Sequence, residues 1–104
     1  MELYSCFPLA VRVQLEELGL SEDRPLTVTG AMTFGGGPLN NFVLQATVKM
    51  VQLLSEGEGS TGLVTSISGM NTKQACALWS AQPNPDGWHF ADVTEQADCV
   101  VFGF

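Results

Sequence analysis

The side chains best suited to covalent chemistry are the three thiols of Cys6, Cys76 and Cys99 and the single imidazole of His89. A thiol acts as a nucleophile when a nearby base takes its proton, so a Cys6–His89 pair would describe a small independent enzyme. That pairing rests on two residue types and on no spacing rule. The cysteines form neither a CxxC pair nor a zinc-ligand pattern, which predicts reduced, buried thiols in a cytoplasmic protein.

A second group of residues could bind a ligand through backbone amides and through charge. Three glycines, 35–37, precede a proline, and Asn40 and Asn41 then open an apolar segment. Glycine loops allow close approach of backbone N–H groups, and the first turn of a helix attracts anions. A helix N-cap is the simpler explanation of Asn40. Lys73 could meet a phosphate or a carboxylate, or could lie in a solvated turn.

Composition limits the partners of the chain. Its 104 residues allow one domain, of which 45% are hydrophobic and only 14% charged. The net charge is −7, and the four basic residues are scattered, which argues against nucleic-acid binding. The beginning of the chain shows no signal peptide, and no apolar run approaches the length of a membrane span. We therefore expect a soluble, cytoplasmic protein.

The elements that must position these residues follow from the apolar pattern. We predict strands over 2–6 and 26–34, an amphipathic helix from Pro8 to a stop at Gly19, and an apolar helix over 40–56. Strands over 62–68 and 75–80, joined by a hairpin-like turn, complete a β-α-β-α-β-β order. This order predicts a layered α/β fold with a mixed sheet. Residues 83–104 are interpreted as a linker or the start of a C-terminal extension.

The helix predicted over 40–56 is apolar almost all the way round, with a polar stripe of Gln45, Lys49 and Gln52. A helix of this kind in a globular protein is buried between two layers. A chain of this length cannot cover it on both sides. We therefore expect a partner or a further segment to cover it.

The segments 2–7, 29–39 and 62–70, taken in this order, resemble parts of the C-terminal domain of the thiolase superfamily. Glu-Leu-Tyr-Ser-Cys-Phe at 2–7 is similar to the Asn-Glu-Ala-Phe or His-Asp-Cys-Phe segment of thiolases, Cys6 and Phe7 matching the second, sterol-carrier-protein-related form. The glycine-rich stretch at 29–39 resembles the Gly-His-Pro loop, and Gly-Leu-Val-Thr-Ser-Ile-Ser-Gly-Met at 62–70 resembles the strand and loop of the second cysteine. The likeness covers roughly residues 2–80 and is closest to divergent acetyl-CoA acetyltransferases.

The resemblance implies roles for particular residues. Tyr4 takes the place of the active-site asparagine or histidine, or is an ordinary strand aromatic. Gly37 stands where thiolases carry the histidine, Ile67 where they carry the second cysteine, and Gly69 on a loop glycine. Tyr4, Gly37 and Gly69 are therefore the candidate catalytic positions, and Asn40, Asn41 and Lys73 the candidate substrate-binding ones. Because the acyl-accepting cysteine belongs to the N-terminal half, none of the three cysteines here takes that role.

The resemblance also implies a function and its partners. Residues 1–82 would be an incomplete thiolase-like C-terminal domain that supplies loops and pocket to an acyl-CoA acyltransferase. Coenzyme A thioesters would be the substrate, with no separate cofactor and no metal. The partner would be an N-terminal thiolase half, and homo-oligomers are possible. The alternative is a non-catalytic small subunit that completes a larger thiolase-like protein. Isolated, the chain is expected to be inactive.

Overall fold

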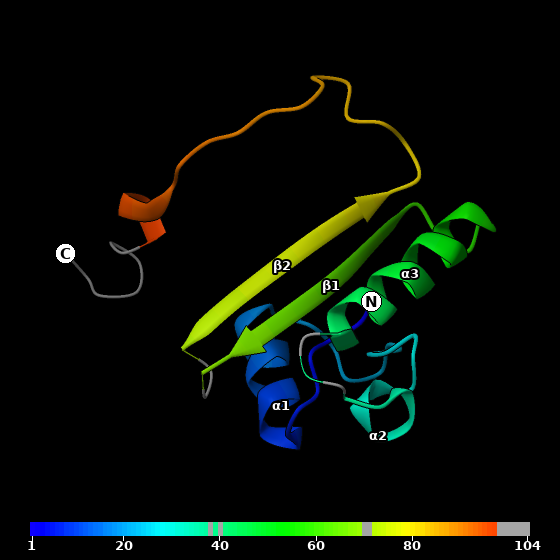
Figure 1. The fold of residues 1–104 in the computed structure, drawn as a ribbon, viewed down its shortest axis with the longest axis vertical. Coiled ribbons are helices and arrows are strands. Elements are labelled where there is room, and N and C mark those ends of the chain that lie inside the picture. The colour runs from blue at the N-terminus through cyan, green and yellow to red at the C-terminus, as the bar shows by residue number, and fades with distance from the viewer. Residues whose placement is uncertain (38, 40, 70–71, 98–104) are drawn as a thin grey trace.

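The computed structural model describes residues 1–37, 39, 41–69 and 72–97, and Figure 1 shows their arrangement. Three helices precede a pair of strands: α1 (Pro8–Glu17), α2 (Ala31–Gly35), α3 (Asn41–Ser55), β1 (Thr61–Ser68) and β2 (Lys73–Ser80). The predicted α/β class is confirmed at this level. The predicted β-α-β-α-β-β order is not, because the two N-terminal strands are replaced by short irregular segments and α2.

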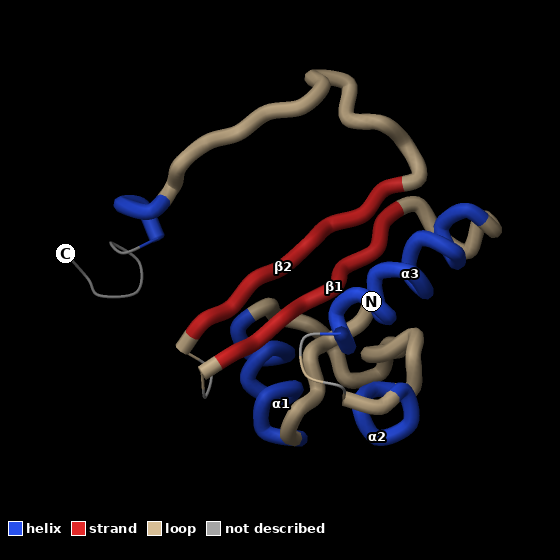
Figure 2. Tube along the Cα trace, in the orientation of Figure 1, coloured by secondary structure: helices blue, strands red, loops and turns tan. Residues whose placement is uncertain are grey.

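The two strands form the hairpin that the sequence predicted, with β2 beginning two residues earlier than expected. They pair antiparallel, with Thr61 opposite Ser80 and Ser68 opposite Lys73. The interior of β1 is mostly buried, whereas β2 is exposed at every position except the half-buried Ala77. Only β1 therefore belongs to the core, and β2 forms the open edge of the sheet (Figure 2).

Strand β1 is covered on both faces. Val64 lies in the core cluster with Ala46, Met50 and Leu54 of α3. Its neighbour Thr65 points to the opposite face, since side chains alternate along a strand, and there it contacts α1. β1 thus lies between α3 and α1.

Helix α3 packs closely on β1 because β1 carries a glycine at the contact. The buried residues of α3 recur every fourth position, at Phe42, Ala46, Met50 and Leu54. A Cβ atom added to Gly62 would lie 2.3 Å from Sδ of Met50, so a side chain at this position would collide with the helix.

The N-terminal segment lies beside β1 on the edge away from β2. Glu2 donates its N–H to the Leu63 carbonyl at 2.8 Å and accepts from the N–H of Thr65 at 3.0 Å, a parallel bridge. On its other side Leu3 donates to the carbonyl of Leu26 at 3.0 Å. The predicted strand over 2–6 is therefore reduced to one bridge, although its place in the fold is that of a strand.

The predicted strand over 26–34 is wrong. After the bond from Leu3 to Leu26, the chain turns at Gly30 (φ +86°) and Ala31 (φ +60°) and enters α2. The reason is competition from side chains, because the amides of Val28 and Thr29 donate to the carboxylate of Glu2 and cannot join a ladder.

Both long helices end on a glycine in the left-handed region. Gly19 (φ +60°) follows α1, where Leu20 donates to the carbonyl of Leu15; Gly57 (φ +82°) follows α3, where Glu58 donates to that of Leu53. Each is a Schellman motif. The predicted stop at Gly19 is confirmed.

Helix α3 is buried on one side only. Its other side exposes Leu44 and Val48, which are 64% and 71% accessible. The prediction that this helix is enclosed between two layers is therefore not met within the described residues.

The chain after β2 leaves the sheet and arches away from it (Figure 1). Residues 81–97 are exposed throughout, with a helical turn at 94–97. Thr94 donates its hydroxyl and its N–H to Asp92 Oδ1, which lowers the pKa of that carboxyl. Trp88 and Phe90 stack on each other rather than on the body, with ring centroids 6.5 Å apart.

Candidate functional site

An open hollow of about 320 Å³ lies where the N-terminal segment, the beginning of α3 and the end of β1 meet. Two of its lining residues, Tyr4 and Ile67, are positions that the sequence singled out. These two residues lie far apart in the sequence, and the fold brings them to the same hollow. The full lining consists of Tyr4, Val43, Leu44, Ser66, Ile67 and Ser68.

Tyr4 is held by its main chain and by its ring. Its N–H donates to Thr65 Oγ1 at 2.8 Å, and its carbonyl accepts from Gln14 Nε2 at 2.9 Å. The ring meets the buried Phe42 edge to face, with centroids 5.7 Å apart. Half-buried, the tyrosine therefore has a fixed position at the margin of the hollow.

A buried pair of polar side chains supports Tyr4 from behind. Thr65 donates its hydroxyl to Gln14 Oε1, and Gln14 Nε2 also donates to the carbonyl of Ala10 at 2.8 Å. Both side chains are buried, and within the described residues no buried polar side-chain atom lacks a partner. A satisfied network of this kind makes the geometry of the N-terminal segment specific, because each displaced group would be left without a partner.

The chemistry of the hollow is that of hydroxyl groups beside an apolar floor. Tyr4, Ser66 and Ser68 carry hydroxyls, and Val43 and Leu44 carry hydrocarbon side chains. Ile67 also lines the hollow, but by strand alternation its side chain lies on the same face of β1 as Thr65. Hydroxyls of this kind can donate to a carbonyl oxygen while the apolar side chains contact an acyl chain. Ile67, only 7% exposed, has no group that transfers protons. The side chains of the lining therefore offer hydrogen bonding and apolar contact.

The two candidate glycines lie outside this lining. Gly37 is exposed, and a Cβ atom there would lie 3.5 Å from Sδ of Met32, an ordinary contact. Gly69 has φ +59°, and its carbonyl accepts the hydroxyl of Thr72. Gly69 directly follows Ser68, which does line the hollow, whereas Gly37 is not brought to it.

The candidate binding residues are divided among three places. Lys73 is exposed and pairs across the hairpin with Ser68, so its charge lies at the end of β1 that borders the hollow. Asn41 opens α3 and lines a separate shallow depression on its outer side with Leu44 and Val48. Asn40 lies outside the described residues.

The thiols and the imidazole do not form a site in the described part of the chain. Cys6 and Cys76 are free and exposed, which contradicts the prediction that they are buried. His89 is exposed in the segment that arches away from the body. Cys99 lies outside the described residues. No group of three histidines, cysteines or carboxylates suited to a metal ion occurs in residues 1–97 as far as they are described.

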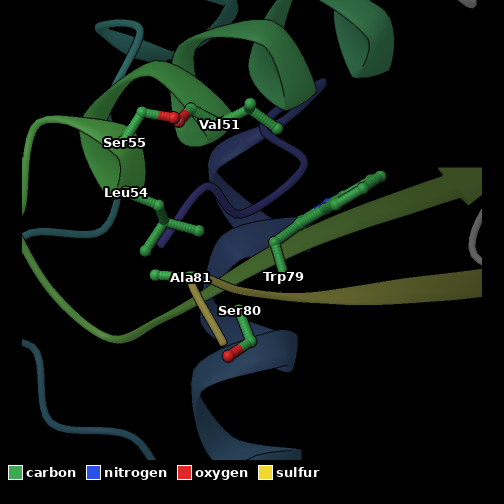
Figure 3. Close-up of a pocket in the computed structure, with 6 residues that line it drawn as sticks. All are labelled: Val51, Leu54, Ser55, Trp79, Ser80 and Ala81. Carbon is green, nitrogen blue, oxygen red and sulfur yellow. The ribbon is translucent and has the colours of Figure 1, made fainter. Parts of the chain in front are cut away.

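A second hollow, of about 360 Å³, lies between the end of α3 and the end of β2 (Figure 3). Its serines already have local partners: Ser55 donates to the carbonyl of Val51, and Ser80 Oγ accepts from the N–H of Gln82. Its other lining residues, Val51, Leu54, Trp79 and Ala81, are apolar or aromatic (Figure 3). We interpret it as the seam between helix and hairpin rather than as a ligand site.

Sequence reasoning missed the polar residues that position Tyr4. Gln14 lies within the amphipathic helix predicted from Pro8, but no buried role was predicted for it. The buried residues of that helix are Ala10, Gln14 and Leu15, whereas the apolar Leu18 after its end is exposed. Glu2, an acidic residue at the start of a predicted strand, was the other available signal.

Comparison with known proteins adds no relative: no protein-family model, no curated protein and no solved structure matches the chain. Among the helices that are described, none combines the length and the apolar character needed to cross a bilayer.

Proposed function

We propose that the chain is the C-terminal part of a thiolase-like acyl-CoA acyltransferase and that the hollow beside Tyr4 belongs to its acyl-CoA pocket. What supports this is one juxtaposition. Tyr4 and Ile67 are the two positions where the resemblance puts an active-site asparagine or histidine and the second cysteine, and both line the same hollow. Two positions so far apart in the sequence meet there only through the fold.

The residues present favour acyl binding and transfer over carbon–carbon bond formation. Claisen chemistry needs an acid–base group at the α-carbon of the thioester, and Ile67 offers only hydrocarbon where the resemblance expects a thiol. Gly37 likewise offers no imidazole. The thiol that accepts the acyl group would come from the N-terminal half, and this chain would supply surface for the acyl group and the coenzyme.

Binding of acetyl-CoA is the first measurement. We expect acetyl-CoA to shift the amide resonances of Ser66, Ile67 and Ser68 while those of the helical turn at 94–97 stay in place. Lys73→Gln should weaken binding about two- to fivefold, since an exposed charge contributes modestly to affinity. Arg12→Gln, which removes an exposed positive charge from α1, serves as the control. Absence of shifts around the hollow would contradict the proposal.

Catalysis is tested after the chain has been combined with an N-terminal thiolase half, by fusion or co-expression. The expected result is CoA-dependent thiolysis with an acyl group trapped on the cysteine of the added half. A stable complex without that intermediate would instead favour the alternative, a non-catalytic subunit that completes a larger thiolase-like partner. The exposed apolar side of α3, with Leu44 and Val48, is the observation that favours this alternative.

A further inference from the structure

The most deeply buried ionisable group among the described residues is the side chain of Glu2, which is 0% exposed. Its Oε2 accepts the N–H of Val28 at 2.6 Å and that of Thr29 at 3.0 Å. Its Oε1 accepts the hydroxyl of Thr29 at 2.8 Å, and the hydroxyl of Thr27 lies 2.9 Å from both oxygens. One carboxylate thus gathers the donors of three consecutive residues.

We propose that Glu2 is a positioning residue, whose carboxylate fixes the loop 27–31 and the beginning of α2 relative to Tyr4. The inference rests on the proposed function in one respect, that the hollow beside Tyr4 is where the acyl group binds. Glu2 does not line the hollow, so its action is exerted through the main chain.

The loop donates hydrogen bonds to both carboxylate oxygens of Glu2. An amide side chain has only one oxygen that can accept. Thr27 Oγ1 already accepts the N–H of Ala31 at 2.7 Å and that of Thr29 at 3.2 Å, so its hydroxyl must donate toward residue 2. In a glutamine the one amide oxygen would take the place of Oε2, which accepts the two N–H groups, and the NH₂ group would then meet the Thr29 hydroxyl that donates to Oε1. A carboxylate accepts at every position and leaves all these donors satisfied.

Residues 2–5 join this loop to the hollow. The backbone of Glu2 bridges to β1, and the N–H of Tyr4 donates to Thr65 on that strand. Ser5 Oγ then accepts the N–H of Met32 in α2 at 3.0 Å. Segment 2–5 therefore connects the loop, α2 and β1, and a shift at Glu2 is carried directly to Tyr4.

Amide hydrogen exchange on the intact chain tests whether Glu2 holds the loop. In Glu2→Gln and Glu2→Ala we expect the amides of Val28, Thr29 and Ala31 to exchange about tenfold faster or more, because bonds to a charged acceptor are lost. Amides in α3 should change little. Glu16→Gln, on the exposed side of α1, should leave the loop unchanged.

Chemical rescue separates positioning from general destabilisation. In Glu2→Ala, added formate should occupy the position of the lost carboxylate and restore slow amide exchange at Val28 and Thr29. In Glu16→Gln, formate should not change the exchange of these amides. Thr29→Val provides a second route should Glu2→Ala not fold, since it removes one hydroxyl donor and should speed exchange at the same amides. Unchanged exchange at these amides in Glu2→Gln and Thr29→Val would overturn the proposal, as would failure of formate to act on folded Glu2→Ala.

Acetyl-CoA binding then tests the link to the hollow. Glu2→Gln should weaken binding, and formate should recover the affinity of Glu2→Ala. If the wild-type chain binds and Glu2→Gln binds equally well, the positioning role is overturned. If the wild-type chain does not bind acetyl-CoA, the acyltransferase proposal falls, and the exchange data decide by themselves whether Glu2 holds the loop.

Discussion

Thr65 is the residue on which the geometry of the N-terminal segment depends most directly. Its hydroxyl accepts from Tyr4 and donates to Gln14, so it uses both its capacities in a buried position. A valine at this site would have nearly the same shape and neither capacity. The consequences can therefore be assigned to hydrogen bonding rather than to packing.

Thr65→Val should lower the free energy of unfolding by about 1–3 kcal/mol, the usual cost of leaving buried polar groups without partners. Urea denaturation of the variant beside wild type measures this directly. Thr61→Val, at an exposed position of the same strand, is the matched control and should change stability by less than about 0.5 kcal/mol. Equal effects of the two substitutions would mean that the buried network contributes nothing.

Gly37 allows the opposite kind of experiment, the addition of a side chain. Its Cβ position meets only ordinary contacts, so Gly37→His should fold with a stability within about 0.5 kcal/mol of wild type. This variant restores the imidazole that the resemblance leads one to expect. Thermal melting followed by circular dichroism is the measurement, and a loss of cooperative unfolding would show that the glycine is required by the backbone.

At the scale of elements, the sequence predicted what depends on local pattern. Pro8 and Gly19 bound α1 as predicted, and the β-branched residues Val64, Thr65 and Ile67 lie in the strand predicted over 62–68. The strand predicted over 26–34 does not form because the amide of Val28 donates to Glu2, 26 residues away. No local sequence pattern reports such a contact. The hollow was foreseeable only in part: the resemblance singled out Tyr4 and Ile67 separately, and the fold was needed to bring them together.

The packing of α3 on β1 depends on the absence of a side chain at Gly62. In Gly62→Ala the added methyl group would overlap Met50, and we expect a loss of about 1–3 kcal/mol of stability, as is usual for overpacked cores. In the Met50→Ala background, Gly62→Ala should cost less stability than it does alone, because the thioether that the methyl group would meet is gone. A double-mutant cycle in urea measures this coupling; additive effects would contradict the contact.

At the scale of the whole molecule, the most prominent feature is apolar surface without a cover. Leu44, Val48 and Val51 face outward on α3, and Leu78 and Trp79 are exposed on β2. Exposed apolar patches of this kind commonly mark contact surfaces. The prediction that a partner or a further segment covers α3, made from the composition of this helix, stays a prediction.

We expect the isolated chain to self-associate at micromolar concentration through this surface. Leu44→Gln combined with Val48→Gln should shift the distribution toward monomer in sedimentation velocity while leaving the melting temperature nearly unchanged, since both side chains are already exposed. Gln45→Ala is a control on the same helix and should not alter association. A wild-type chain that sediments as a single monomeric species would contradict the expectation.

The bridge between Glu2 and β1 also determines the order in which the molecule can assemble. Tyr4 and Thr65 are 61 residues apart, whereas α3, β1 and β2 are neighbours in the chain and can pair with little loop closure. The backbone of segment 2–5 therefore finds its partners only after β1 has formed or is free to pair. Segment 2–5 is thus expected to be among the last parts of the described body to reach its final place.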